Sequence, residues 1–127
     1  MLGIIFGSGF EHFVLDNQKT KKVETPFGDV ELDTGNFNGQ AVVLLHRHGK
    51  DHRFAPHQIP YKAQMWALKQ SSVTDIIAVA SVGGMAAENA PGHFTVPDQI
   101  LDYTSGRDGT YWGEAGMPMK HIDFTEP

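Results

Sequence analysis

The stretch from His46 to Gln58, HRHGKDHRFAPHQ, concentrates side chains that bind metals or anions. It holds four of the chain's seven histidines and three of its ten lysine and arginine residues in thirteen positions. The alternatives are a metal site built on the imidazoles, an anion site built on the cations, and a solvated surface loop. These alternatives make different demands on the residues between the histidines.

The histidine spacing fits a metal site only in part. His46, His48 and His52 are spaced as metal ligands often are, and HRHGKDH differs by one inserted residue from the HxHxDH pattern of metallo-β-lactamase-like hydrolases. That insertion turns Asp51 and His52 away from the first two histidines. Fixed positive charges also interleave with the imidazoles, and Asp51 is the one carboxylate of the stretch, which disfavours a bound cation. We therefore expect no metal here.

The cations of the same stretch favour an anion site. Arg47, Lys50 and Arg53 against Asp51 give three positive charges and one negative, in a chain whose net charge is −5. Such a basic island attracts small anions. An arginine presents a planar fork of donors that matches phosphate, and a neighbouring histidine adds a further hydrogen bond. We predict that Arg47 and His48 bind phosphate.

A glycine-rich turn near the N-terminus offers a second anion-binding element. The apolar run Leu2 to Phe6 predicts a buried strand that ends at Gly7-Ser8-Gly9, where glycines let backbone N–H groups approach a ligand. The turn lacks both the lysine of a Walker motif and the third glycine of a dinucleotide-binding motif. A plain structural turn therefore stays the alternative.

A second apolar run, VTDIIAVASVGG from Val73 to Gly84, predicts another buried strand with Ser81 near its end. Ligands of open α/β sheets bind at the carboxyl ends of the strands. We therefore expect Ser8, Ser81, Arg47 and His48 to converge on one phosphate.

The rest of the sequence predicts several strands and one clear helix. Val23 to His46 indicates strands and turns, with Asn38-Gly39 as the strongest hairpin signal. Ala41 to Leu45 is apolar on both faces, which predicts a central strand. Apolar residues at helical spacing after Pro60 predict a helix.

In that helix we expect Met65 and Trp66 to be core residues, because apolar helix stripes usually face the core. HFTVPDQILDY, residues 93–103, predicts a further strand. Five or six strands with one strong helix leave too few crossover helices for a parallel sheet. The chain also stops after the strand-like HIDF, so we expect it to be part of a longer fold.

Composition bounds the function classes. The net charge argues against a nucleic-acid partner, because phosphate backbones need a broad basic surface. No apolar stretch approaches the roughly 20 residues of a membrane span, so we expect no membrane partner. The lack of cysteine removes thiolate chemistry and fits a cytoplasmic protein. Four histidines are expected to be surface or packing residues: His12, His46, His57 and His93.

Taken together, six segments resemble the trimeric methylthioadenosine/purine nucleoside phosphorylase family. They are GIIFGSGF, ETPFG, LLHRHGKDHRFAPHQIPYKAQMWALKQ, VASVGGM, PGHFTVPDQILDYTSGR and HIDF. The resemblance runs colinearly through the chain, whereas family chains are about twice as long. It implies an α/β fold with a twisted mixed β-sheet flanked by helices, incomplete here. Residues 1–127 would be the N-terminal half of a single nucleoside phosphorylase domain.

The resemblance also implies roles for particular residues. It assigns phosphate binding to five positions: Ser8, Arg47, His48, Ala80 and Ser81. It assigns the substrate pocket to three more: His52, Pro56 and His121. The family often has threonine and then alanine where this chain has Ala80-Ser81, so a hydroxyl or backbone N–H groups would serve there instead. His121 matches a histidine that reaches into a neighbouring subunit's pocket.

The implied reaction is phosphorolysis of a purine nucleoside, with inorganic phosphate as co-substrate and no cofactor or metal. Phosphate attacks C1′ as the base departs, so the enzyme positions phosphate against a cationic sugar and needs no covalent nucleophile. HRFAPHQ, VGG and LDYTSGR resemble the methylthioinosine and 6-oxopurine members most, although base choice lies in the family's C-terminal half.

Two alternatives stay open: a methylthioadenosine phosphorylase, and a non-catalytic fragment that binds a nucleoside or an anion. The expected partners are purine nucleoside and phosphate, further copies in a homotrimer, and a C-terminal half supplied as a second chain or a missing segment.

Overall fold

The computed structural model describes residues 1–119 and 121–125. The chain divides into two compact units, Met1–Ser81 and Val82–Pro127. Within the described residues, every helix and strand belongs to the first unit. No helix in this described part of the chain is both long and apolar enough to cross a membrane.

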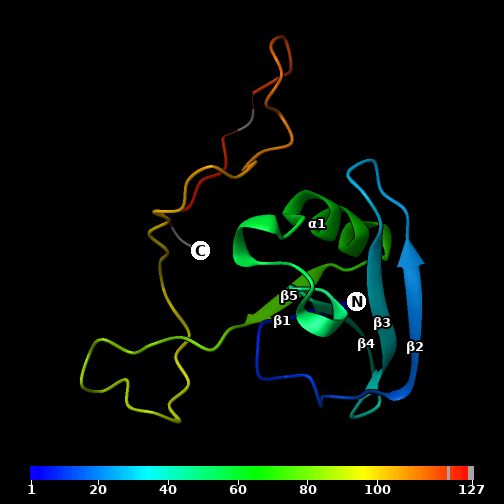
Figure 1. Cartoon of the computed structure of the whole chain (residues 1–127), viewed down its shortest axis with the longest axis vertical. Helices are drawn as coiled ribbons and strands as arrows, with labels where there is room; N and C mark the ends of the chain where they lie inside the picture. Colours follow the sequence, from blue (N-terminus) through cyan, green and yellow to red (C-terminus); the bar gives the residue numbers. More distant parts are fainter. Residues whose placement is uncertain (120, 126–127) are drawn as a thin grey trace. The chain divides into compact units, whose positions relative to one another are not determined.

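Five strands form one mixed sheet in the order β2-β3-β4-β1-β5 (Figure 1). Their bounds are β1 Leu2–Phe6, β2 Asp16–Val23, β3 Val30–Phe37, β4 Gln40–His46 and β5 Asp75–Val79. β1 pairs in parallel with β4 on one side and with β5 on the other, whereas β2, β3 and β4 pair antiparallel. The carboxyl ends of β4, β1 and β5 therefore lie next to one another.

The hairpin between β3 and β4 has the predicted two-residue turn. Phe37 pairs with Gln40, and the intervening Asn38 and Gly39 have φ angles of 49° and 79°. Two successive positive φ angles define the primed turn that matches strand twist, and Asn-Gly adopts it most readily. The sequence prediction of this hairpin is confirmed.

β4 is the middle strand and is buried on both faces, as predicted. Val43 and Leu45 belong to one apolar cluster, which includes Leu68 of the helix. Val42 and Leu44 point to the other face and pack in a second cluster. An apolar run without alternation is typical of a strand covered on both sides.

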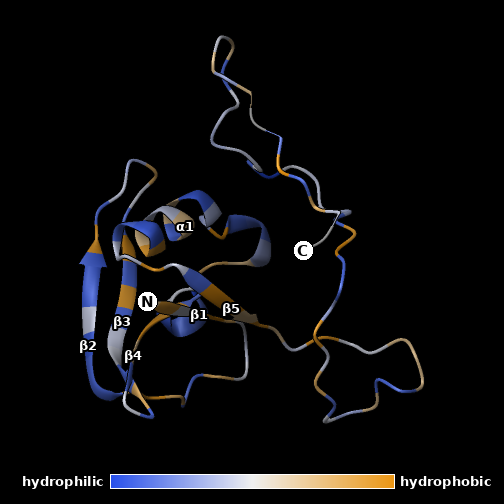
Figure 2. Ribbon diagram, turned by 180° about the vertical axis from the view of Figure 1, so that it is seen from behind, coloured by the Kyte–Doolittle hydropathy of each residue, from blue (hydrophilic) through white to orange (hydrophobic). Residues whose placement is uncertain are grey.

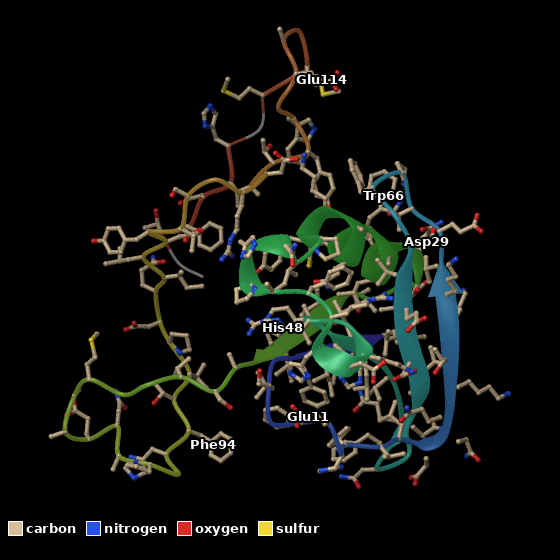
Figure 3. All side chains as sticks on the ribbon, in the orientation of Figure 1. Glu11, Asp29, His48, Trp66, Phe94 and Glu114 are labelled. Carbon is tan, nitrogen blue, oxygen red and sulfur yellow. The ribbon has the colours of Figure 1, made fainter. Side chains whose placement is uncertain are left out.

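The predicted helix is present as α1, Tyr61–Gln70, but its buried face differs from the expected one. Its buried residues are Ala63, Gln64, Ala67 and Leu68. Met65 and Trp66 are 41% and 42% exposed, so the prediction that both are core residues is wrong for this unit. They fall between the residues that share the buried face at three- and four-residue spacing. Trp66 instead meets Phe27 edge to face at 5.6 Å, near the β2–β3 turn where Figure 3 labels Trp66 and Asp29.

β2 escaped prediction because its sequence, DNQKTKKV, is polar. Apart from Val23, every residue of this edge strand is exposed or half-buried, and its ribbon is blue along most of its length (Figure 2). β2 exists because it pairs with β3 across a register broken once between Asp16 and Lys19. Backbone pairing with β3, and not an apolar pattern, therefore determines that β2 forms.

Two predictions about apolar runs need correction. β5 forms where expected, but it is an edge strand with Ile76 and Ile77 exposed, and not a buried one. Residues 93–103 form no strand, and Phe94 there is 95% exposed. A strand needs a neighbour for its backbone groups, and the described residues of the second unit supply none.

Candidate anion-binding site

Three chain segments leave the sheet side by side at the ends of β4, β1 and β5. Phe6, the last residue of β1, pairs with His46 and with Val79, the last residues of its two neighbours. The backbone continues this alignment, because Arg47 N–H donates to Phe6 O at 2.9 Å and Gly7 N–H donates to Val79 O at 3.0 Å. The sequence prediction of convergent strand ends is thus borne out for the backbone.

Arg47 lies directly against the glycine turn. Its Nη2 atom is 2.9 Å from the position that a Cβ atom of Gly7 would occupy, so only glycine lets the guanidinium approach this closely. Gln64 of α1 donates to Arg47 O at 2.7 Å and holds the backbone from the other side. The buried Nε atom of Arg47 has no hydrogen-bond partner among the described residues. A buried donor without a partner is costly, and an anion would satisfy it.

The two predicted serines also meet at this edge. Ser81 Oγ donates to Ser8 O at 3.3 Å, although the two residues are 73 positions apart. Ala80 follows β5 directly. Gly9 has a φ of 96°, which glycine adopts without strain, and its N–H donates to Glu11 Oε1 at 3.0 Å.

The histidines of the loop after β4 contact the loop backbone and stack on each other. His48 Nδ1 lies 2.9 Å from Phe54 O, and Phe54 N–H donates to His48 O at 3.0 Å. The His48 and His52 rings stack with centroids 5.6 Å apart. His52 Nε2 lies 3.3 Å from Ser8 Oγ, which links this loop to the turn after β1.

The Ser8–His52–Glu11 arrangement does not form a nucleophilic triad. Glu11 Oε1 lies 3.5 Å from His52 Nε2, the same nitrogen that faces Ser8 Oγ. In a serine hydrolase the carboxylate orients the opposite ring nitrogen, so that the first nitrogen is free to take the hydroxyl proton. These contacts therefore do not orient His52 as a general base for Ser8.

Comparisons with known proteins show the family of this chain. A family model described as the phosphorylase superfamily matches residues 1–127. The chain belongs to the phosphorylase superfamily.

Relatives of this superfamily match along nearly the whole chain. S-methyl-5′-thioadenosine phosphorylase of Mycolicibacterium smegmatis is 40% identical over 100% of this chain and 49% of its own length. The 6-oxopurine nucleoside phosphorylase of Pyrococcus furiosus is 40% identical over 99% of this chain and 49% of its own. The probable S-methyl-5′-thioinosine phosphorylase of Pseudomonas syringae is 40% identical over 98% and 52%. The chain thus spans about half the length of these relatives, and identity does not separate their three named activities.

A solved superfamily structure confirms the α/β fold with a mixed sheet. Methylthioadenosine phosphorylase from Schistosoma mansoni in complex with adenine matches with a TM-score of 0.87 at 37% identity. The match covers 98% of this chain and 47% of that one. The chain therefore shares its fold with about half of that structure.

Of the three residues expected in the substrate pocket, His52 lies at the strand ends, where its Nε2 is 3.3 Å from Ser8 Oγ. Pro56 opens the short 3₁₀ turn η2, Pro56–Gln58, and is exposed. His121 lies in the second unit and is exposed. The pocket roles of His52, Pro56 and His121 stay predictions.

The expected surface and packing histidines vary in their environment. His12, His57 and His93 are exposed, whereas His46 is half-buried and its Nε2 lies 3.6 Å from Asp33 Oδ2. No group of three or more metal-ligating side chains occurs within residues 1–119 and 121–125. A surface hollow is lined by Asp29, His46 and Lys50 among others, but not by the serines of the strand ends.

Two residues at or near this edge were not predicted from sequence. Glu11 adds a carboxylate beside His52, and the Gly9 N–H that it accepts lowers the pKa of Glu11 below its ordinary value of 4.5. Asp33 is a buried carboxylate within β3. The signal for Asp33 was available, since an aspartate inside a strand seldom stays without a partner.

Proposed function

We propose that this chain supplies the phosphate-binding part of a purine nucleoside phosphorylase. The observation that carries the proposal is the meeting of Arg47, Ser8 and Ser81 at the ends of three adjacent parallel strands. A guanidinium and two hydroxyls match the oxygens of one phosphate. We include His48 and the Ala80 backbone in this phosphate site.

In the proposed reaction an oxygen of inorganic phosphate attacks C1′ of the nucleoside. The bond from C1′ to the purine nitrogen breaks, and the base leaves with the electron pair and takes up a proton. The products are a sugar 1-phosphate and the free purine. Arg47 and the two serine hydroxyls hold the phosphate in place against the developing positive charge of the sugar, so their contribution is positioning and electrostatics.

The proposed substrate is 5′-methylthioinosine or another 6-oxopurine nucleoside, with methylthioadenosine as the alternative. Two observations support this proposal. The segments HRFAPHQ, VGG and LDYTSGR resemble the methylthioinosine and 6-oxopurine members, and relatives are named as methylthioadenosine, 6-oxopurine nucleoside and methylthioinosine phosphorylases. His52 would line the pocket, because it already faces Ser8 across the strand ends. Pro56 and His121 are proposed to complete that lining.

We further propose that residues 1–127 correspond to the N-terminal half of one phosphorylase domain that works as a homotrimer in the cytoplasm, without a cofactor. Coverage of about half of each relative supports the first part of this proposal.

The test is an assay of four nucleosides with and without inorganic phosphate. Methylthioinosine, methylthioadenosine, inosine and adenosine are incubated with the protein, and free base and sugar 1-phosphate are measured. We expect cleavage only with phosphate, and fastest with a 6-oxopurine. Cleavage that proceeds equally without phosphate would make the protein a hydrolase and overturn the proposal. Phosphate binding without any cleavage would support the rival function, a non-catalytic anion-binding fragment.

A further inference from the structure

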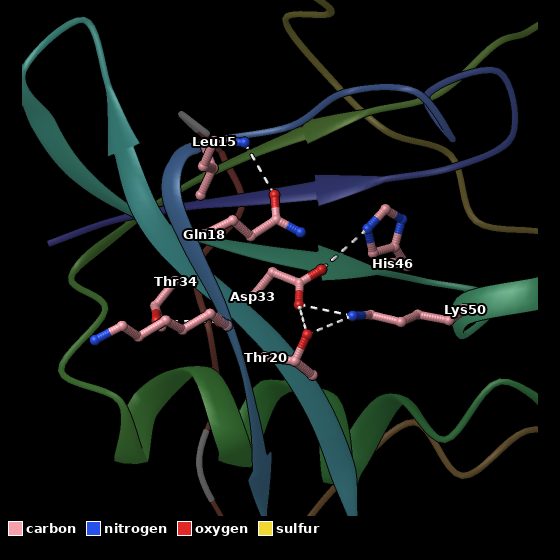
Figure 4. Close-up of polar contacts among 8 residues, drawn as sticks. Leu15, Gln18, Thr20, Asp33, Thr34, His46 and Lys50 are labelled. Atoms are coloured by element: carbon pink, nitrogen blue, oxygen red, sulfur yellow. Dashed lines mark hydrogen bonds and ion pairs between the residues drawn. The ribbon is translucent and has the colours of Figure 1, made fainter.

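A buried carboxylate links the sheet to the loop that carries Arg47 and His48. Asp33 of β3 is 1% exposed, and its Oδ1 accepts hydrogen bonds from Thr20 Oγ1 at 2.6 Å and from Lys50 Nζ at 2.8 Å. Lys50 Nζ also donates to Thr20 Oγ1 at 2.7 Å, which closes a triangle between β2, β3 and the loop (Figure 4). His46 faces the second oxygen, Oδ2.

The loop held by this triangle has an unfavourable backbone. Gly49, Asp51 and His52 have φ angles of 76°, 63° and 51°. Left-handed conformations at two residues other than glycine cost free energy and persist only where surrounding contacts fix them. Lys50 sits among these three residues, so its anchor to Asp33 acts where the backbone most needs fixing.

The contact with Asp33 also determines where the positive charge of Lys50 lies. Lys50 is one of three cations in the basic loop, yet its Nζ is engaged by Asp33 and Thr20. A buried carboxylate retains its cation strongly, because an unpaired charge in that position is costly. The charge of Lys50 is therefore directed into the sheet, and the charge of Arg47 is left for the anion.

We propose that Asp33 is a positioning residue for phosphate: through Lys50 it fixes the loop 47–54, so that Arg47, His48 and His52 stand ready at the strand ends. This inference rests on the proposed function, and it adds a residue remote from the reacting atoms. The competing interpretation is that Lys50 is itself a phosphate ligand, which Asp33 merely withholds. The two interpretations predict opposite signs when Asp33 loses its charge.

The test compares Asp33→Asn with Asp29→Asn. Asp29 pairs with Lys22 at 2.7 Å on the surface, so its variant makes the same chemical change in an aspartate–lysine pair outside the loop. Hydrogen exchange is measured without phosphate at the Gly49 and Phe54 amides, which donate to His46 O and His48 O within the loop. The Ser71 amide, which donates to Ala67 O at the end of α1, is the reference outside the loop. Phosphate affinity is then measured by ³¹P NMR titration with inorganic phosphate.

In Asp33→Asn we expect exchange at Gly49 and Phe54 to accelerate, and the phosphate Kd to rise, each by about tenfold, the scale of one weakened charge-assisted hydrogen bond. Ser71 and the Asp29→Asn variant should match the wild type. Loop exchange that stays unchanged, or rises only in step with Ser71, overturns the positioning role. Tighter phosphate binding in Asp33→Asn also overturns it, in favour of Lys50 as a ligand.

Two further cases need their own measurement: a variant that does not fold, and a wild type that binds no phosphate. Where Asp33→Asn does not fold, Thr20→Val removes the two hydrogen bonds of the Thr20 hydroxyl at an exposed position and leaves the Lys50–Asp33 pair. The same pattern of a looser loop and weaker phosphate binding is expected. Where the wild type binds no phosphate, the proposed function fails by itself. The exchange measurement then still decides whether Asp33 fixes the loop.

Discussion

His52 Nε2 lies 3.3 Å from Ser8 Oγ, across 44 residues of sequence. This contact joins the loop after β4 to the glycine turn after β1 through side chains that can both donate to an anion. Each partner is placed by its own strand, and the parallel pairing of β1 with β4 brings the two ends together. The geometry of the site therefore follows from the order of the strands.

Replacing Arg47 by alanine should raise the phosphate KM and lower kcat. The loss of a bidentate charged contact that also acts in the transition state costs about 2–4 kcal/mol in kcat/KM. Steady-state kinetics with phosphate varied will measure the change. Arg53→Ala is the matched control, because Arg53 lies over the Phe54 ring at 4.9 Å. An unchanged phosphate dependence in Arg47→Ala would remove Arg47 from the site.

Adding one methyl group at Gly7 should weaken phosphate binding with little loss of stability. A Cβ atom there would lie 2.9 Å from Arg47 Nη2, the movable end of a long side chain, so the guanidinium must shift. At Gly35 the same methyl would meet Leu15 Cβ at 2.7 Å and Asp16 O at 2.8 Å, where backbone must move. Gly35→Ala should therefore destabilise the fold by about 1–3 kcal/mol. Thermal unfolding and phosphate titration of both variants will show whether the two effects separate.

Glu11→Gln should tighten phosphate binding at low salt. The Glu11 carboxylate occupies the Gly9 N–H and lies 3.5 Å from His52 Nε2, so it places a negative charge beside the proposed anion. The gain should shrink as salt rises from about 0.01 M to 1 M, because exposed charges are screened. Titrations across that range, with the exposed Glu24→Gln as control, measure the effect. Weaker binding in Glu11→Gln would show that the carboxylate supports the site through the turn.

The same residue gives a pH dependence of stability. Because the Gly9 N–H holds the pKa of Glu11 below 4.5 in the folded chain, this contact contributes stability above pH 4.5. That contribution is lost as the pH falls through the lowered pKa. The difference in unfolding free energy between the wild type and Glu11→Gln should be constant near neutral pH and disappear in acid. Urea denaturation at several pH values checks this, and a difference that grows in acid contradicts it.

Two neighbours on α1 should differ sharply when shortened to alanine. Leu68 is 1% exposed and packs against β4, so Leu68→Ala should cost about 2–5 kcal/mol of unfolding free energy. Trp66 is half-exposed and meets Phe27 edge to face, so Trp66→Ala should cost about 1 kcal/mol. Chemical denaturation of both variants provides the comparison. Equal losses would place Trp66 in the core after all.

Local sequence signals predicted the parts of the fold that local chemistry determines. The run Leu2–Phe6, the Asn38-Gly39 turn and the apolar strand before His46 each form as expected, because one turn type or one burial pattern suits them. The polar strand β2 was missed because its pairing with β3 is a long-range property. The strand predicted at residues 93–103 is absent. An apolar segment without a pairing partner can have the same sequence pattern as a strand, so the sequence alone does not distinguish the two.

The candidate site shows the same division. Arg47 and Ser8 could be singled out because their residue types and strand-end positions already favour phosphate. The partners that hold them could not, since Gln64 reaches Arg47 O from a helix and Asp33 reaches Lys50 from another strand. Such contacts join residues 17 positions apart through the fold alone. An aspartate within a strand, as at Asp33, indicates that a buried partner exists, but it does not identify Lys50 as that partner.

The meeting of three strand ends also bears on how the chain responds to its surroundings. The segments that carry Ser8, His52 and Ser81 are separated by as much as 73 residues, and an anion seated among them would bridge all three at once. Such an ion acts as a reversible cross-link that exists only in the native state. At a concentration a hundred times its Kd it would add about 2.7 kcal/mol to the unfolding free energy. Phosphate in the buffer would then raise the melting temperature of this protein.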